Sequence, residues 1–158
     1  MVGIMTVPFR ILPRLDDLNR PFWQGGERGE LVFLHCAACQ RIQHPPQPIC
    51  AYCRSHELVP RAVSGRARLA TFTVNHQAWM PGPELPYVVA IVELEEDPTV
   101  RLTTNLVGCA PEAARVGQMV RVVFEHHADS HGDVWLPLFE LDPERDEVEA
   151  VSPSRGAA

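Results

Sequence analysis

Four cysteines have the spacing of a metal site. They form two pairs, Cys36 with Cys39 and Cys50 with Cys53, and two residues separate the members of each pair. Two Cys-x2-Cys turns at this separation can place four thiolates around one tetrahedral Zn²⁺. Because four cysteines fill the coordination sphere, the zinc predicted here is structural and not catalytic.

Two other kinds of cysteine chemistry compete with zinc binding. A disulfide within a Cys-x2-Cys turn closes a strained ring, and a single such motif can be a redox centre. Three prolines lie between the pairs (Pro45, Pro46 and Pro48), and the duplicated motif favours a static metal site. Cys109 stands apart, and we expect it to be a small buried apolar group.

The charge of the chain is unevenly distributed. All 14 basic residues are arginine, which excludes Schiff-base chemistry and lysine general bases. Residues 1–68 carry a balance of +4, whereas residues 69–158 carry −10. An anionic ligand would therefore bind to the part that contains the cysteines.

The sequence predicts a soluble cytoplasmic protein. The longest apolar run, residues 87–92, is too short to cross a bilayer, and the N-terminus lacks the pattern of a signal peptide. A reducing compartment also suits zinc-bound thiolates.

The first part of the chain is predicted to be an arm with a short helix over residues 15–20, which Pro21 limits. Phe22 and Trp23 follow, beside the flexible pair Gly25-Gly26. We favour these two aromatic side chains as an anchor that packs the arm onto the main body. The alternative is a docking surface for a partner protein.

Hydrophobic patterning predicts a mainly β protein. Segments 30–35, 42–44 and 57–60 favour the short strands of a zinc ribbon. Five further segments favour strands, over residues 66–76, 87–94, 101–107, 119–125 and 134–141. With a short helical link at 111–114, this order matches a five-stranded Greek-key barrel of the OB-fold type.

The predicted organisation has four parts. They are an N-terminal arm (1–28), a rubredoxin-like zinc ribbon (29–60), an OB-fold (61–142) and a disordered acidic tail (143–158). A ribbon this small buries too little apolar surface to fold alone, so zinc must supply much of its stability.

Several short motifs occur in this order along the chain. They are Pro21-Phe22-Trp23, the four cysteines, Pro45-Pro46, Ser64-Gly65-Arg66, Pro86-Tyr87-Val88-Val89, Asn105-Leu106-Val107-Gly108 and Leu136-Pro137-Leu138-Phe139. In these motifs the chain resembles the DUF35 family, the acyl-CoA-associated OB-fold proteins with an N-terminal rubredoxin-like zinc ribbon. The resemblance covers about residues 20–140. The sequence departs from the family pattern at Gln40 and Arg54, where such zinc knuckles often have glycine because the turn needs a positive backbone angle.

The resemblance implies a non-catalytic accessory subunit. Members of the family are partners of thiolases, thiolase-like aldolases, CoA synthases or acyl-CoA hydratases in lipid, polyketide or steroid side-chain breakdown. The chain would then stabilise a thiolase-superfamily enzyme in a hetero-oligomer and help to hold or pass an acyl-CoA thioester. By itself it is not expected to be an enzyme, although its partner would be an acyl-CoA lyase, aldolase or acyltransferase.

If this role holds, arginines of the basic part are candidates for binding the phosphates of CoA. The candidates are Arg41, Arg54, Arg61, Arg66 and Arg68. The alternative for each is a solvated side chain or an ion pair with Glu30 or Glu57, and Arg66, at the start of the barrel, is the best single candidate.

Histidines form another polar cluster. His126, His127 and His131 lie close together in sequence, but no carboxylate or cysteine spacing fixes a metal geometry, so we predict a loop. The sequence contains no nucleophile motif, glycine-rich phosphate loop or pair of catalytic carboxylates.

Single-stranded nucleic acid is the competing ligand, since zinc ribbons and OB-folds both commonly bind it. The acidic barrel argues against this, because a groove that follows a phosphate backbone needs positive charge. We therefore predict no nucleic acid or membrane partner.

Overall fold

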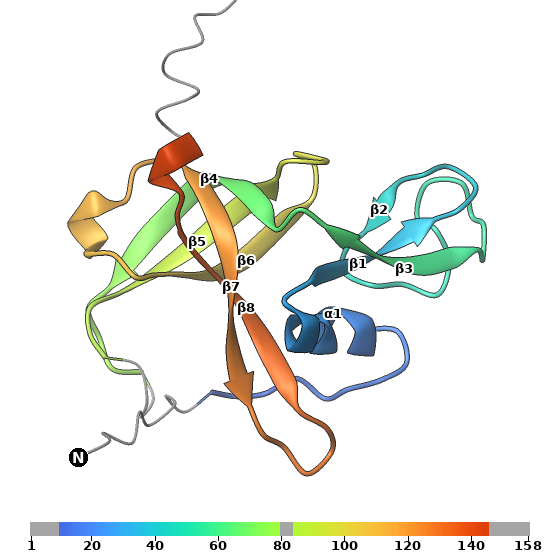
Figure 1. Ribbon diagram of the computed structural model, residues 1–158, viewed down its shortest axis with the longest axis horizontal. Helices are drawn as coiled ribbons and strands as arrows, with labels where there is room; N and C mark the ends of the chain where they lie inside the picture. Colours follow the sequence, from blue (N-terminus) through green and yellow to red (C-terminus); the bar gives the residue numbers. More distant parts are fainter. Residues whose placement is uncertain (1–9, 80–83, 146–158) are drawn as a thin grey trace, which may run out of the picture.

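The computed structural model describes residues 10–79 and 84–145. A three-stranded sheet lies beside a closed five-stranded barrel, and the short helix α1 (Arg20–Gln24) lies between the sheet and the long β7–β8 hairpin of the barrel (Figure 1). The predicted order of zinc ribbon followed by OB-fold barrel is confirmed.

The small sheet is built around β1 (Leu31–Cys36), which is buried along nearly its whole length. It pairs antiparallel with β2 (Ile42–Gln43) on one edge and with β3 (Leu58–Val63) on the other. The first cysteine is the last residue of β1. The strand therefore delivers a metal ligand directly to the turn that follows it.

The barrel has the strand order β4-β5-β6-β8-β7. Its strands are β4 (Arg66–Asn75), β5 (Tyr87–Leu94), β6 (Arg101–Val107), β7 (Met119–His127) and β8 (Val134–Leu141). The long β4 pairs with β5 and with β7, and a register shift between Leu69 and Thr71 interrupts its ladder with β5. Such a shift bends a strand, as closure of a small barrel requires.

The short helix lies later in the chain than the sequence suggested. Residues 15–19 do not form a helix; α1 begins at Arg20 and contains Pro21 in its first turn. Proline is tolerated there because the first N–H groups of a helix have no intrahelical acceptor. Upstream, the Asp16 carboxylate accepts the backbone N–H groups of Leu18 and Asn19 and fixes a turn.

Two strand ends of the barrel also differ from expectation. β4 ends at Asn75, one residue earlier than predicted, and β7 continues to His127. The link between β6 and β7 contains the 3-10 turn η2 (Pro111–Ala113), close to the predicted helical segment. Val134 and Phe139 are fully buried in β8, whereas Leu136 is only partly buried.

Gly25 and Gly26 belong to the 3-10 turn η1 (Gly25–Arg28), so they are not a flexible hinge. A Cβ atom on Gly26 would lie 2.4 Å from the Cβ of Trp135 and 2.5 Å from a ring carbon of Phe124. Glycine is needed because η1 packs directly onto the β7–β8 hairpin.

One hydrophobic core runs through the ribbon and the barrel. Phe22, Leu31 and Phe33 from the first part belong to the same buried cluster as the barrel residues Leu69 and Phe139. The predicted boundary between residues 60 and 61 lies inside β3. At the other end of the chain, residues 143–145 form a helical turn, and the rest of the predicted tail lies outside the described residues.

Candidate metal centre and cavity

The four predicted zinc ligands converge. The sulfur of Cys36 lies 3.5 Å from that of Cys53, the sulfur of Cys39 lies 3.6 Å from that of Cys50, and all four sulfurs are within 4.8 Å of one another. With Zn–S bonds of about 2.3 Å, tetrahedral geometry places sulfurs about 3.8 Å apart. The site therefore fits one structural Zn²⁺, as predicted.

Each cysteine pair lies in a tight knuckle. The backbone N–H of Gln40 donates to the carbonyl of Cys36 over 2.9 Å, and that of Arg54 donates to the carbonyl of Cys50 over 3.0 Å. Gln40 and Arg54 have φ values of 61° and 63°. Both positions thus keep the left-handed conformation of a zinc knuckle without the glycine that would adopt it most easily.

Backbone N–H groups stabilise the thiolate form of two of the cysteines. The backbone of Cys53 is the main cause that lowers the pKa of Cys50 to about 6, and the backbone of Cys39 lowers the pKa of Cys36. These N–H groups favour the thiolate form that metal ligation requires at Cys50 and Cys36, whereas burial and the neighbouring sulfurs raise the pKa of Cys39 and Cys53. Behind the second knuckle, the buried Gln43 accepts the backbone N–H of Ala51 over 2.9 Å, a support that the sequence did not reveal.

A cavity of about 830 Å³ lies where the arm, the ribbon and the barrel meet. Its apolar wall includes Leu18, Phe22, Trp23, Pro45 and Pro46, and the barrel contributes five consecutive residues of β6 and three of β8. These barrel residues are Arg101, Leu102, Thr103, Thr104, Asn105, Leu136, Pro137 and Leu138. No sequence pattern predicted this cavity, because its walls come from three separate parts of the chain.

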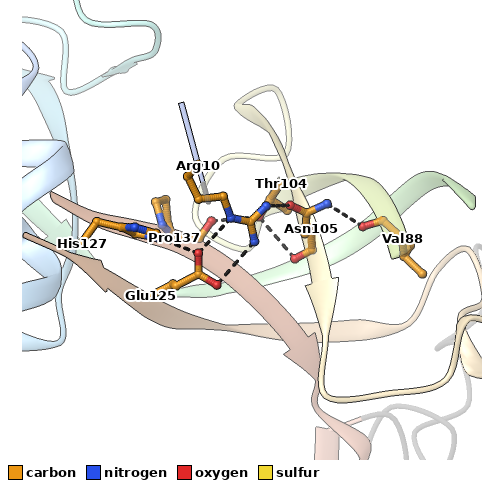
Figure 2. A network of polar contacts seen from close by, with 7 residues as sticks. All are labelled: Arg10, Val88, Thr104, Asn105, Glu125, His127 and Pro137. Atoms are coloured by element: carbon orange, nitrogen blue, oxygen red, sulfur yellow. Dashed lines mark hydrogen bonds and ion pairs between the residues drawn. The ribbon is translucent and has the colours of Figure 1, made fainter. Parts of the chain in front are cut away.

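Arg10 fastens the arm at one side of the cavity (Figure 2). Its Nε donates to Glu125 Oε1 over 2.9 Å, and its Nη1 donates to Asn105 Oδ1 over 3.1 Å. His127 contacts the same carboxylate over 2.8 Å, and Asn105 donates to the carbonyl of Val88. The network ties the arm to β5, β6 and β7.

The charge of Glu125 is stabilised within this network. Burial by itself would raise the pKa of Glu125, but hydrogen bonds from Arg10 and His127 outweigh it and lower the pKa below the ordinary value of 4.5. Arg10 and Glu125 are only 18% and 20% exposed. They therefore form a mostly desolvated ion pair.

The two aromatic residues of the arm have different surroundings. Phe22 is buried and packs edge-on against Trp23 and Phe33, with ring centroids 4.7 and 5.5 Å away. His44 completes this aromatic cluster, and burial lowers the pKa of its imidazole. Phe22 therefore acts as an anchor between arm and ribbon, whereas Trp23 is partly buried and also lines the cavity.

The five arginines considered for CoA phosphates have varied surroundings. Arg41 lies over the ring of Tyr52, 4.4 Å from its centroid, and Arg61 donates to Gln40. Arg68 donates to the carbonyl of Gly117 over 2.7 Å. Within residues 10–79 and 84–145, the arginines that line the large cavity are instead Arg10 and Arg101. The sequence had not proposed either of these two.

The histidine cluster is a strand end and not only a loop. His126 and His127 belong to β7, and His131 lies in the turn that follows. His126 contacts Asp133 over 2.8 Å and stacks on Trp135 with centroids 4.6 Å apart. A shared metal ion needs at least three His, Cys, Asp or Glu side chains whose ligand atoms lie close together. Within the described part of the chain, the four cysteines form that group.

Among the described residues, no helix has the length and apolar character needed to cross a membrane.

Two family descriptions match adjacent parts of the chain. The ChsH2 rubredoxin-like zinc ribbon domain matches residues 23–59, and the ChsH2 C-terminal OB-fold domain matches residues 60–125. The two matches agree with the observed sheet and barrel and support the assignment of the cysteines to zinc.

Similar sequences include enzyme subunits and a scaffold protein. A probable enoyl-CoA hydratase alpha subunit from Thermomonospora curvata is 37% identical over 127 residues, which are 80% of this chain and 38% of the relative. The 3-oxo-4,17-pregnadiene-20-carboxyl-CoA hydratase alpha subunit from Mycobacterium tuberculosis is 33% identical over 116 residues, 73% of this chain and 36% of the relative. A DUF35 domain-containing scaffold protein from Methanocaldococcus jannaschii is 34% identical over 109 residues, 68% of this chain and 76% of the relative.

The chain thus spans little more than a third of the two hydratase subunits but about three quarters of the scaffold protein. Among solved structures, a chain of an Ltp2-ChsH2(DUF35) aldolase superposes with a TM-score of 0.71 at 35% identity. The superposition covers 82% of this chain and 98% of the other.

Proposed function

Because the chain belongs to the family of DUF35 domain-containing scaffold proteins, we propose that it is a non-catalytic accessory subunit of a thiolase-superfamily enzyme. It stabilises this partner in a hetero-oligomer and helps to hold an acyl-CoA thioester. Steroid side-chain or other lipid degradation is the proposed setting, and the cytoplasm is the proposed location.

The observation that carries this proposal is the likeness to a chain of the aldolase. The superposition covers 98% of that chain, so the barrel and ribbon seen here match the whole of it and not an isolated motif. The name of that assembly, Ltp2-ChsH2(DUF35) aldolase, joins a DUF35 component with an aldolase. An accessory role also agrees with the closed geometry of the four-cysteine site, which leaves no ligand position for substrate.

The role in thioester binding has support from two observations. Two relatives are named as subunits of hydratases that act on CoA thioesters. The arm, ribbon and barrel also enclose a cavity of about 830 Å³ with an apolar wall and two arginines. Apolar cavities with a few polar groups are typical of small-molecule sites. The arginines Arg41, Arg54, Arg61, Arg66 and Arg68 remain candidates for contacts with the phosphates.

The test of the accessory role is purification of the tagged chain from its native cell, followed by identification of bound proteins by mass spectrometry. We expect a thiolase-superfamily enzyme in a defined ratio to the chain. The matched control is the Cys39→Ser variant, which removes one zinc ligand and should lose the partner. Recovery of the chain alone, or with a nucleic-acid enzyme, would contradict the proposal.

The role of the arginines needs a separate measurement. Replacing Arg66 and Arg68 together by alanine should weaken binding of a CoA ester by the complex in calorimetry, and unchanged affinity would exclude them. A gel-shift assay with single-stranded oligonucleotides examines the competing class of ligand. We expect no shift at moderate salt.

A further inference from the structure

The barrel closes between β6 and β8 through a short ladder. These two parallel strands pair at Leu106 with Phe139 and at Val107 with Glu140, whereas β6 pairs with β5 from Arg101 to Leu106. Nearer the start of β6, the hydroxyl of Thr104 donates to the carbonyl of Pro137 over 2.8 Å, so a side chain bridges the gap there. The strands therefore leave a gap beside residues 101–105.

The lining of the cavity shows that strand edges face it. Successive side chains of a strand point to opposite faces of the sheet, so a cavity over one face contacts every second residue. Here the lining residues are consecutive, 101–105 in β6 and 136–138 in β8. The cavity therefore lies along the gap between the two strands.

The pairing identifies the backbone groups that face the gap. The carbonyl of Pro137 points toward β6. Because the backbone groups of every second residue in a strand point in the same direction, those of Trp135 and Phe139 also point toward β6. In a parallel ladder one residue of each pair bonds to both neighbours of the other. Because the backbone of Phe139 points toward β6, Phe139 is that residue, and Asn105 and Val107 are its partners. By alternation, the N–H and C=O groups of Arg101 and Thr103 face the gap.

Pro137 explains why the gap does not close. A proline has no N–H group, so β8 cannot continue the ladder with β6 at this position. The antiparallel ladder with β7 is unaffected, since Pro137 pairs with Phe124 through the other edge of β8. The gap therefore offers N–H donors on β6 and at Trp135, and it offers carbonyl acceptors along the same line.

We propose that this gap binds the pantetheine arm of an acyl-CoA thioester through strand-like hydrogen bonds. The inference rests on the proposed function, which supplies the thioester, and it adds the place and the mode of binding. Pantetheine is an extended chain with two secondary amides, and each amide offers one N–H and one C=O group. The amides pair with the backbone of Thr103 and its neighbours along β6.

The remaining walls of the cavity suit such a chain. The methylene groups of pantetheine pack against Leu18, Trp23 and the two prolines of the ribbon, which also line the cavity. Arg101 lies at the start of the open edge with its side chain 65% exposed, where it forms an ion pair with Glu93 over 2.6 Å. The phosphates of CoA would leave the cavity past this arginine.

The test uses the zinc-loaded full chain labelled with ¹⁵N, with pantetheine as the probe. We expect saturable shifts of the backbone N–H signals of Arg101, Thr103, Asn105 and Trp135. An ω-mercapto alcohol of similar length, which has no amides, should shift these signals at least tenfold less at equal concentration. Thr103→Pro removes one N–H that faces the gap and should weaken pantetheine binding about tenfold, whereas Thr103→Ala should bind as the wild type does.

Three results would overturn the inference. They are the absence of shifts in these four signals at saturating pantetheine, equal shifts with the amide-free thiol, and shifts confined to the arginines of the ribbon. Co-purification of the partner is measured in parallel. If the thiolase-like partner binds but pantetheine leaves the gap unchanged, this inference fails while the proposed accessory function stands; if no such partner binds, the proposed function itself fails.

Discussion

The ion pair between Arg10 and Glu125 should be the main electrostatic fastening of the arm. Replacing Glu125 by glutamine keeps the shape of the side chain but removes its charge. Arg10 then keeps its hydrogen bond to Asn105 and loses the carboxylate that compensates its desolvation. The arm forms one wall of the cavity, so the change should loosen that wall as well as lower the stability.

The burial of the pair sets the expected magnitude. Exposed ion pairs contribute about 0–1 kcal/mol, whereas removal of one partner from a fully buried pair costs about 3–5 kcal/mol. With side chains 18% and 20% exposed, this pair lies between those limits. We expect Glu125→Gln to lower the free energy of unfolding by about 2 kcal/mol.

A double-mutant cycle with Arg10→Met, measured by urea unfolding, isolates the interaction itself. The expected coupling is about 1–2 kcal/mol. The matched control is the pair of Arg101 with Glu93, whose side chains are 65% and 23% exposed. Its coupling should stay at about 0.5 kcal/mol or below. Additive effects of the two changes at Arg10 and Glu125 would refute the reasoning.

The pH dependence provides an independent check with a definite sign. The pKa of Glu125 is lower in the folded protein than its ordinary value of 4.5. Its contribution to stability is therefore fully present above pH 4.5 and is lost as the pH falls through the folded pKa. The Glu125→Gln variant should lose less stability than the wild type over this acidic range, and equal losses would show that Glu125 does not titrate as described.

Three further predictions concern the metal site and the backbone. Cys39→Ser should reduce bound zinc, measured by elemental analysis, and should expose the ribbon to proteolysis; full zinc occupancy would contradict the four-cysteine site. Gly26→Ala should lower the free energy of unfolding by about 1–3 kcal/mol, because the added carbon meets Phe124 and Trp135, and a neutral effect would mean that the hairpin yields easily. Arg54→Gly should raise the melting temperature, because it relieves a positive φ that costs a non-glycine residue about 1 kcal/mol; an unchanged or lower value would argue against strain there.

The features that follow from local patterning were predictable from the sequence. Two Cys-x2-Cys turns identified the metal site because the ligand spacing is set by a short loop. Alternation of apolar residues located the barrel strands to within about two residues, as at Arg101–Val107, since one side of each strand faces the core.

The features that depend on tertiary approach were not predictable. The Gly25-Gly26 pair suggested flexibility, but Gly26 is required because the β7–β8 hairpin, more than 90 residues later, packs against it. Arg10 showed no motif, and its role depends on a carboxylate in β7 and an amide in β6. The helix was misplaced because Pro21 was expected to limit a preceding helix, although it occupies the first turn of the following one.

The cavity has walls that are held in place by three different kinds of interaction. The arm is fastened by an ion pair, the proline wall belongs to a ribbon that depends on its metal, and the strand edges belong to a barrel stabilised by apolar packing. Acid, a chelator and heat should therefore each open the same space by a different route. Ligand binding at this cavity therefore depends on the whole subunit. A ligand makes all its contacts only when the chain is folded, metal-loaded and closed by its arm.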